Sequence, residues 1–590
     1  MSDQLLSYFE RELVSIRSAL AEYSSDFPQH AATMRLNQND QEDPNISRLI
    51  EAAALLNAKT EKRLDEQFPE ILQDLINIVY PGYLQIIPSY TPFSLDLDVD
   101  AATSPILLEK GTELSVTHDD IESIFTLVDD AKIEPYHIAD TCASTAPFNF
   151  PSPHALRRAE SAIQVTLKCN DPDAQFSQMS SEHLDFYLRG FESNARGLID
   201  LLLLNTEAIT LYNEEQQVSI APKRLRTRIA DHDFCWLPSY DGHLTGFDIL
   251  RDYFAFPDKA AYMRIDNLGD ELSAFDSNEV TLTFFIHQLP VEYLSLFGPK
   301  VFLLNTVPAL NLFGRRGEPM RYDFSKLSMP VIADAQQQDL YTVVSVESVS
   351  EVLPTGEVPL TPLYESGYWS DSDAPQWQSS QHWDHKGRRC MNLSVSYTQM
   401  PTDQEAVILS TKLKVCNGRT PCLIPTGSEG VPMAAVSLPG ELTVIKTPTA
   451  PQYPSLDNQL TWRFLAILNA NFATLVQTEE PTLALQDVLR LSCNTIQCAQ
   501  AYAIKKVSYR HLVAPITIDR QSIFASGTEV EVLVDDELLG VDFSVFAQVL
   551  NAVFAQHCSF DRFIQLSVQR FGSDAPGVDF EKLHGSQLCL

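Results

Sequence analysis

The sequence predicts an α+β multidomain fold with an N-terminal helical segment, β-rich middle domains and a C-terminal mixed α+β domain. Two changes of pattern along the 590 residues lead to this prediction. Apolar residues recur every three or four positions up to residue 90, and from there they alternate with polar residues. After residue 461 both periods occur together. We therefore expect four parts, covering residues 1–90, 91–240, 241–394 and 395–590.

Three helices are predicted in the first ninety residues. The first covers residues 3–27, and its apolar stripe contains Leu5, Phe9, Leu13, Ile16 and Leu20. The second begins at Asp43-Pro44, which supplies an N-cap oxygen and a ring that fixes φ. The third follows Phe68-Pro69 and stops at Tyr80-Pro81-Gly82.

The middle of the chain shows the period of two that is typical of half-buried antiparallel strands. It begins at residues 93–99 and recurs at 163–167 and 280–286, with helices predicted near 195–204 and 247–253. Residues 365–389 hold three of the five tryptophans. Disordered linkers rarely carry three indoles, so this segment predicts an ordered surface loop.

The C-terminal part predicts helices and strands in alternation. Helices are expected from residue 461 and at 483–491, followed by a strand at 530–534, a helix at 543–553 and a strand at 564–568. The order strand, helix, strand favours an α+β unit of the split βαβ kind.

The charge of the chain restricts its partners. With 42 lysines and arginines against 78 aspartates and glutamates, the net charge is −36, which disfavours nucleic acid and anionic lipid surfaces. No signal peptide is predicted at the N-terminus, and the most apolar run, at 198–204, is too short to span a bilayer. The ten cysteines form no CxxC pair, which indicates reduced thiols. We therefore expect a cytoplasmic protein whose partners are proteins.

Motifs for catalysis and for cofactors are absent from the sequence. It contains no Gly-Lys dipeptide, no GxGxxG, no GxSxG and no HExxH, so we assign no catalytic residue and no cofactor. His382, Asp384, His385 and Cys390 could supply metal ligands, but a solvated loop is the better interpretation without paired ligands. Gly111 and Gly527, each in a Gly-Thr-Glu triplet, are expected in tight turns between strands.

Several short phrases resemble one known family. They are Asp-Glu-Gln-Phe-Pro-Glu at 65–70, Ile-Val-Tyr-Pro-Gly-Tyr-Leu at 78–84, Asp-Tyr-Phe-Ala-Phe-Pro at 252–257, Val-Pro-Ala-Leu-Asn-Leu-Phe at 307–313 and Leu-Thr-Trp-Arg at 460–463. These phrases, in this order, are similar to those of the TssF family (also VasA or ImpG), baseplate subunits of the type VI secretion system. The tail after Gly572 matches no family phrase.

The resemblance implies a structural wedge subunit, related in architecture to baseplate wedge proteins of contractile phage tails, and no enzymatic activity. It also implies TssG, a second copy of the chain, TssK, TssE and hub proteins as partners, with assembly at the inner membrane. Within this interpretation we expect Leu5, Phe9, Leu13, Ile16 and Leu20 to form a seam with TssG and a second copy.

Three alternatives stay open. A helical stripe ordinarily packs on its own domain, so the seam residues could be internal. A carbohydrate-active enzyme or sugar-binding protein could use Trp369, Trp377 and Trp383 as a platform, together with two carboxylates about 5 to 10 Å apart. Composition alone also permits a passive scaffold unrelated to secretion.

Overall fold

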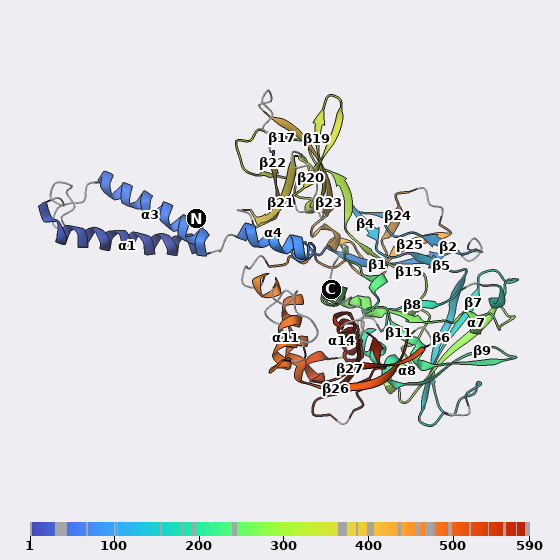
Figure 1. Cartoon of the computed structure of the whole chain (residues 1–590). Coiled ribbons are helices and arrows are strands. Elements are labelled where there is room, and N and C mark those ends of the chain that lie inside the picture. The colour runs from blue at the N-terminus through green and yellow to red at the C-terminus, as the bar shows by residue number, and fades with distance from the viewer. Residues whose placement is uncertain are drawn as a thin grey trace. The chain divides into compact units, whose positions relative to one another are not determined.

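The computed structural model forms two compact units (Figure 1). One contains Met1–Val79 and Leu456–Trp462, and the other contains Tyr80–Ser455 and Arg463–Leu590. The structure describes residues 3–584 except 30–43, 66–68, 99–101, 103, 154–155, 180, 192–194, 239–244, 364–374, 385–386, 398–405, 435–437, 456–460, 466–475, 477, 494–497, 519–520, 541, 559–561 and 574. Both units combine segments that are distant in sequence, so the four consecutive parts stay a prediction.

The smaller unit contains the three predicted helices, which confirms their positions. They are α1 (Asp3–Asp26), α3 (Pro44–Asp65) and α4 (Pro69–Val79). The two longer helices, α1 and α3, run antiparallel and side by side, and we call this pair the hairpin (Figure 1). Arg11 on α1 forms an ion pair with Glu61 on α3, with 2.5 Å between the two side chains. Proline at the first position of both α3 and α4 explains why the boundaries could be predicted locally.

The larger unit begins with a closed barrel. Its strands, in order around the barrel, are β1 (Tyr90–Leu97), β15 (Thr306–Leu310), β4 (Ile121–Leu127), β3 (Glu113–His118), β24 (Glu429–Pro432) and β25 (Gly440–Val444). Beside it lies a pair formed by β2 (Ile106–Leu108) and β5 (Ala131–Ile133). The alternation predicted at Phe93 and Leu95 directs both side chains into the barrel core, where the Phe93 ring meets Phe125 edge-on.

Two further sheets follow the barrel. One has the order β10 (Gln217–Ile220), β9 (Thr206–Tyr212), β13 (Glu279–Ile286), β7 (Ser161–Cys169) and β6 (Tyr136–Thr145). The other has the order β11 (Leu225–Thr227), β12 (Tyr262–Ile265), β8 (Leu184–Leu188) and β14 (Phe302–Leu303). The helices of this region are α5 (Ala195–Asn205), α6 (Thr245–Ala255), α7 (Gly269–Leu272) and α8 (Val291–Leu294). The predicted strands at 163–167 and 280–286 are confirmed as central neighbours, β7 and β13.

The largest sheet has eight strands. Seven follow the order β16 (Phe313–Arg316), β23 (Val407–Cys416), β19 (Thr342–Leu353), β20 (Gly356–Pro362), β21 (Gln376–Trp383), β22 (Arg389–Ser396) and β18 (Met329–Pro330), and β17 (Met320–Tyr322) also pairs with β23. Part of the predicted tryptophan-rich loop is therefore strand β21. Apolar and polar residues do not alternate clearly along β21, because Gln, Ser and His occupy most of its positions. The strand could therefore not be predicted from the sequence pattern.

The C-terminal sheet consists of β26 (Ile504–Ile518), β27 (Gln521–Val534), β28 (Arg562–Arg570), β29 (Val578–Asp579) and β30 (Leu583–His584). Its helices are α11 (Pro481–Ser492), α12 (Ala499–Ala503), α13 (Asp536–Leu539) and α14 (Phe543–His557). Strands β27 and β28 are parallel and pair directly, with α14 in the crossover between them. The βαβ unit is therefore present but not split, which corrects the sequence prediction.

One of the two predicted glycine turns is wrong. Gly111 lies in a turn with φ of +89°, as expected, but Gly527 lies inside β27. A Cβ atom at Gly527 would approach ring carbons of Phe563 on β28 to 2.5 Å. The glycine therefore permits close packing of a ring on the strand, rather than a turn.

Candidate interface site

The predicted seam lies on α1, which packs against α3 in the hairpin. Phe9, Leu13, Ile16 and Leu20 are each partly buried, while the side chain of Leu5 lies outside the described residues. On α3, Ala54 and Ala58 lie one turn apart and are fully buried. Small side chains at this spacing allow two helices to approach closely. The seam residues thus lie in a helix pair that the chain partly covers by itself.

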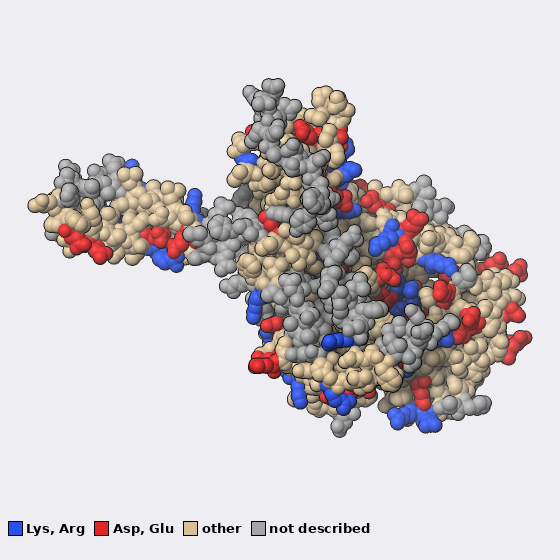
Figure 2. Space-filling model, in the orientation of Figure 1, with Lys and Arg blue, Asp and Glu red and all other residues tan. Residues whose placement is uncertain are grey.

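Other apolar side chains of the hairpin remain exposed. Val14 on α1 and Leu49 and Leu56 on α3 each leave about two-thirds of their surface accessible, at 68%, 70% and 66%. Charged residues on the visible face of the hairpin gather mainly along one edge, and uncharged side chains cover the rest (Figure 2). Exposed apolar side chains that gather in a patch often mark a contact with another protein, whereas single ones are common on any surface. The hairpin is therefore a candidate contact surface.

The interior of the larger unit holds a buried ion pair. Nζ of Lys259 donates to Oδ2 of Asp252 at 2.7 Å, and both side chains are almost inaccessible, at 0% and 1%. Asp252 also accepts from the backbone N–H groups of Trp236 and Leu237. Since every charge here has a partner, the pair fixes the end of α6 against the segment before it.

Two tyrosines connect the first residues of this unit to the same region. The Tyr80 hydroxyl donates to Asp248 on α6, and burial raises the pKa of Tyr80 well above its usual value, so the hydroxyl stays a donor. The Tyr90 hydroxyl donates to Asp258 at 2.6 Å, and Lys446 pairs with the same carboxylate. These contacts join α6, β1 and the segment after β25.

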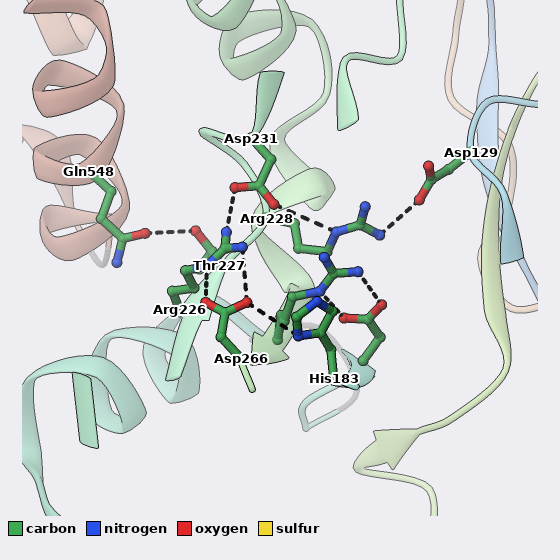
Figure 3. Close-up of polar contacts among 10 residues, drawn as sticks. Asp129, His183, Arg226, Thr227, Arg228, Asp231, Asp266 and Gln548 are labelled. Atoms are coloured by element: carbon green, nitrogen blue, oxygen red, sulfur yellow. Dashed lines mark hydrogen bonds and ion pairs between the residues drawn. The ribbon is translucent and has the colours of Figure 1, made fainter. Parts of the chain in front are cut away.

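A network of polar side chains surrounds β11 and β12 (Figure 3). Arg226 pairs with Asp231 and with Asp266, where its Nε lies 2.5 Å from the carboxylate. Arg228 pairs with Asp129, which follows barrel strand β4, at 2.8 Å. The network therefore ties the four-stranded sheet to the barrel.

A neutral hydrogen bond extends this network to the C-terminal region. The hydroxyl of Thr227 on β11 donates to the side chain of Gln548 on α14 at 3.0 Å (Figure 3). Asp231 is held by two arginines, Arg226 and Arg228. The arrangement is one of structural ion pairs that fasten three parts of the unit together.

Comparison with known proteins identifies the family. The family model described as "Type VI secretion system, TssF" matches residues 1–587. This chain belongs to the TssF family. It is 23% identical to the type VI secretion system component TssF1 of Pseudomonas aeruginosa strain PAO1, over the full length of both chains.

Two solved structures share the fold of this TssF-family chain. A chain of a TssK-TssF-TssG baseplate subcomplex superposes with a TM-score of 0.71 at 18% identity, covering 92% of this chain and 99% of the other. A chain of a type VI secretion baseplate complex gives 0.56 at 18% identity, covering 99% and 100%. The predicted fold class, with helical N-terminus, β-rich middle and mixed C-terminal part, is confirmed by these matches.

Two of the phrases that resembled the TssF family contain buried polar residues with structural contacts. Asp252 in the phrase at 252–257 is the buried partner of Lys259. Asn311 in the phrase at 307–313 is fully buried and donates from Nδ2 to the carbonyl of Ile124 and to Asn417, each at 2.7 Å. In this TssF-family chain both phrases therefore hold sheets and helices together. Sequence reasoning missed Lys259, because a lysine two residues after a proline gives no local sign of burial.

The tryptophans do not form a joint platform in the described part of the chain. Trp377 is buried in the core of the eight-stranded sheet, and its indole N–H donates to the carbonyl of Leu360. Trp383 is 45% exposed and lies six residues further along β21, which at about 3.3 Å per residue is roughly 20 Å away. Trp369 lies outside the described residues. The sugar-platform alternative therefore has no support here.

The residues considered for metal binding lie around the turn between β21 and β22. His382 and Cys390 are opposite each other in the ladder, Asp384 pairs with Arg388 at 3.0 Å, and His385 lies outside the described residues. None of the nine cysteines that the structure describes takes part in a disulfide. No helix within the described ranges is both long and apolar enough to cross a membrane.

Proposed function

We propose that this TssF-family chain is a structural wedge subunit of a type VI secretion baseplate, and that it acts by docking and rearranging interfaces rather than by catalysis. The match of the TssF family model over residues 1–587 carries the proposal. Its relatives of the same fold are found in baseplate complexes, one of them with TssK and TssG. We infer the same partners here, with a second copy, TssE and hub proteins, in the cytoplasm at the inner membrane.

The hairpin is the proposed contact with TssG and the second copy. Val14, Leu49 and Leu56 are apolar and about two-thirds exposed, so burial beneath a partner helix would add a favourable contribution of about 25 cal/mol per Å². The predicted seam of Leu5, Phe9, Leu13, Ile16 and Leu20 lies on α1, which packs against α3, and would complete the same bundle; Phe9, Leu13, Ile16 and Leu20 are partly buried. In a helix bundle, each helix buries its apolar side chains against neighbouring helices.

Glutamate substitutions on the exposed face test this proposal. Leu49→Glu with Leu56→Glu should abolish co-purification with TssG from the same bacterium, because two charges would enter an apolar interface. Since both side chains are exposed, the helical circular dichroism signal of the isolated chain should not change. These positions are better suited than Leu13 and Ile16, where glutamate would also disturb contacts within the hairpin.

A matched control uses the larger unit. Leu327 is 93% exposed between β17 and β18, so Leu327→Glu adds the same charge elsewhere and should leave co-purification unchanged. Recovery of TssG with the double variant at the wild-type ratio would overturn the assignment of the hairpin. Absence of any complex between the wild-type chain and TssG or TssK would overturn the proposed function itself.

A further inference from the structure

A cavity of about 620 Å³ opens at one end of the eight-stranded sheet of the larger unit. Its wall includes the end of β21, the turn into β22, the segment before β19 and the residues that follow β23. Three arginines line it, Arg388, Arg389 and Arg419, together with two carboxylates, Asp334 and Asp339. Asp339 pairs with Arg388, and Asp334 pairs with Arg315, which is not part of the lining. Two of the lining arginines therefore have no carboxylate partner in the wall, in a chain whose net charge is −36.

Arg389 carries a buried charge that no described carboxylate balances. Its side chain is 6% exposed, and its guanidinium donates to the carbonyls of Leu84 and Pro454 and to the side chain of Gln381. Burial lowers the pKa of the guanidinium to about 10, so the group stays charged at neutral pH. Its partners satisfy its hydrogen bonds, but they are all neutral. A carboxylate brought into the cavity would therefore gain from this charge.

The other two arginines lie nearer to solvent. Arg388 pairs with Asp339 at 2.7 Å and with Asp384 at 3.0 Å. Arg419 is exposed, and among the described residues no ion pair is formed by its side chain. The cavity thus combines one balanced cation with two that have no carboxylate partner in the described chain.

Aromatic rings complete the wall. Trp383 is 45% exposed, lies 5.2 Å from the Arg389 guanidinium, and its ring centre is 6.0 Å from that of Tyr453. Tyr341 also lines the cavity. Tryptophan, tyrosine and arginine dominate the energetics of protein interfaces, and here they surround one concavity.

We infer that this cavity receives a carboxylate-bearing segment of a partner subunit, with Arg389 and Arg419 facing the acidic group and Trp383 packing against the segment. The inference rests on the proposed function, because it requires an assembled complex. A second copy of this chain is also rich in carboxylates, so charge alone does not distinguish it from another subunit. The test below makes that distinction. The neutral partners of Arg389 are the feature that favours an acidic ligand over an apolar one.

Carbodiimide coupling tests the inference in the complex of the full chain with TssG and TssK. Arg419→Lys places a primary amine at the rim of the cavity, and a water-soluble carbodiimide joins such an amine to a carboxylate in contact with it as an amide. We expect mass spectrometry to find Lys at position 419 linked to an Asp or Glu of TssG or TssK. Lys326, exposed in the same sheet region but outside the cavity lining, is the internal control and should form no such link.

Affinity measurements provide a second readout. Trp383→Ala and Arg419→Glu should each weaken binding of the partner about tenfold or more, as for truncation of an interface hot spot. The matched variants Phe571→Ala and Lys326→Glu alter an exposed ring and an exposed cation elsewhere and should not change binding. Because all four side chains are exposed, the melting temperature of each isolated variant should equal that of the wild type.

The outcomes separate the two proposals. Normal assembly with Trp383→Ala and Arg419→Glu, together with no link from position 419, would overturn the inference and leave the proposed function standing. A link from position 419 to a second copy of this chain would also overturn it. Failure of the wild-type chain to join TssG or TssK would overturn the proposed function and this inference with it.

Discussion

Leu49 and Leu56 on α3 are 70% and 66% exposed, whereas Leu409 and Leu413 on β23 are completely buried. The same residue type is thus used in opposite ways in the two units. The larger unit encloses its apolar side chains within sheets that join distant segments, and it contains the buried ion pair of Lys259 and Asp252. The hairpin has one helix pair and leaves apolar positions uncovered. The two units therefore differ in how much apolar surface they leave accessible, and the proposed docking of the hairpin depends on this difference.

The largest effect on the free energy of unfolding is expected at the buried ion pair of Lys259 and Asp252. Lys259→Met should destabilise the larger unit by about 3 to 5 kcal/mol, because the Asp252 carboxylate would lose its cation while remaining buried. Urea unfolding followed by tryptophan fluorescence measures this. The exposed pair of Lys223 and Glu581 is the control, since Lys223→Met should change stability by less than about 1 kcal/mol. Equal effects of the two substitutions would contradict the role given to burial.

A smaller loss of stability is expected at Gly527, where β27 packs against the ring of Phe563. Gly527→Ala should cost about 1 to 3 kcal/mol, because the new Cβ would overlap the ring of Phe563 and force a shift. Gly314, on β16, has open space at its Cβ position and negative φ, so Gly314→Ala should be nearly neutral. Thermal unfolding of both variants gives the comparison, and a neutral Gly527→Ala would show that the strand yields to the added methyl group.

The junction of α5 and α14 should show a pH effect. Asp200 accepts from the backbone N–H groups of Phe543 and Ser544 at the start of α14, and burial raises the pKa of Asp200 to about 6. Because this pKa lies above its value in the unfolded chain, its contribution to stability is complete below about pH 4 and is lost as pH rises through about 6.

Asp200→Asn tests the direction of this effect. The asparagine does not titrate, so the fall in unfolding free energy between pH 4 and pH 7 should become smaller, by up to about 2 kcal/mol. Unfolding in urea at both pH values measures it. A variant whose pH dependence matches the wild type would show that Asp200 does not titrate in this range.

The smallest effect is expected on the exposed face of the hairpin. Leu49→Ala with Leu56→Ala should change the stability of the isolated chain by less than about 1 kcal/mol, since little apolar surface is lost from a buried site. Leu413→Ala, the same change in the core of the eight-stranded sheet, should cost about 2 to 5 kcal/mol. Similar losses in both units would remove the distinction between them.

Local patterns explain what could be predicted. The three N-terminal helices were found because prolines begin α3 and α4 and because their apolar residues repeat within one segment. The pairing of β27 with β28 was placed in the wrong βαβ type, since the order of elements does not say which strands are neighbours. The identical triplets at Gly111 and Gly527 differ only in their surroundings: a turn in one case, and the ring of Phe563 in the other.

The sites depended on contacts between distant segments. Arg389 donates to the carbonyl of Leu84, which lies 305 positions earlier in the sequence. Lys259 lies beyond the end of α6, and the chain has to turn back there for its side chain to meet Asp252. Neither contact could be predicted from the spacing of residues. The exposed positions of the hairpin were equally hidden, because a helical stripe in a sequence does not show which of its members a neighbouring helix will cover.

Closure of the barrel imposes a delay during translation. Strand β1 pairs through Phe93 with Val444 of β25, so its second neighbour is made about 350 residues later. A ribosome that adds about 5 to 20 residues per second needs roughly 20 to 70 seconds for that length. For this time the nascent chain holds an apolar strand with an open edge, a state in which wrong pairing competes with folding. We therefore expect the pace of synthesis, as well as final stability, to govern how much of this protein reaches its assembled form.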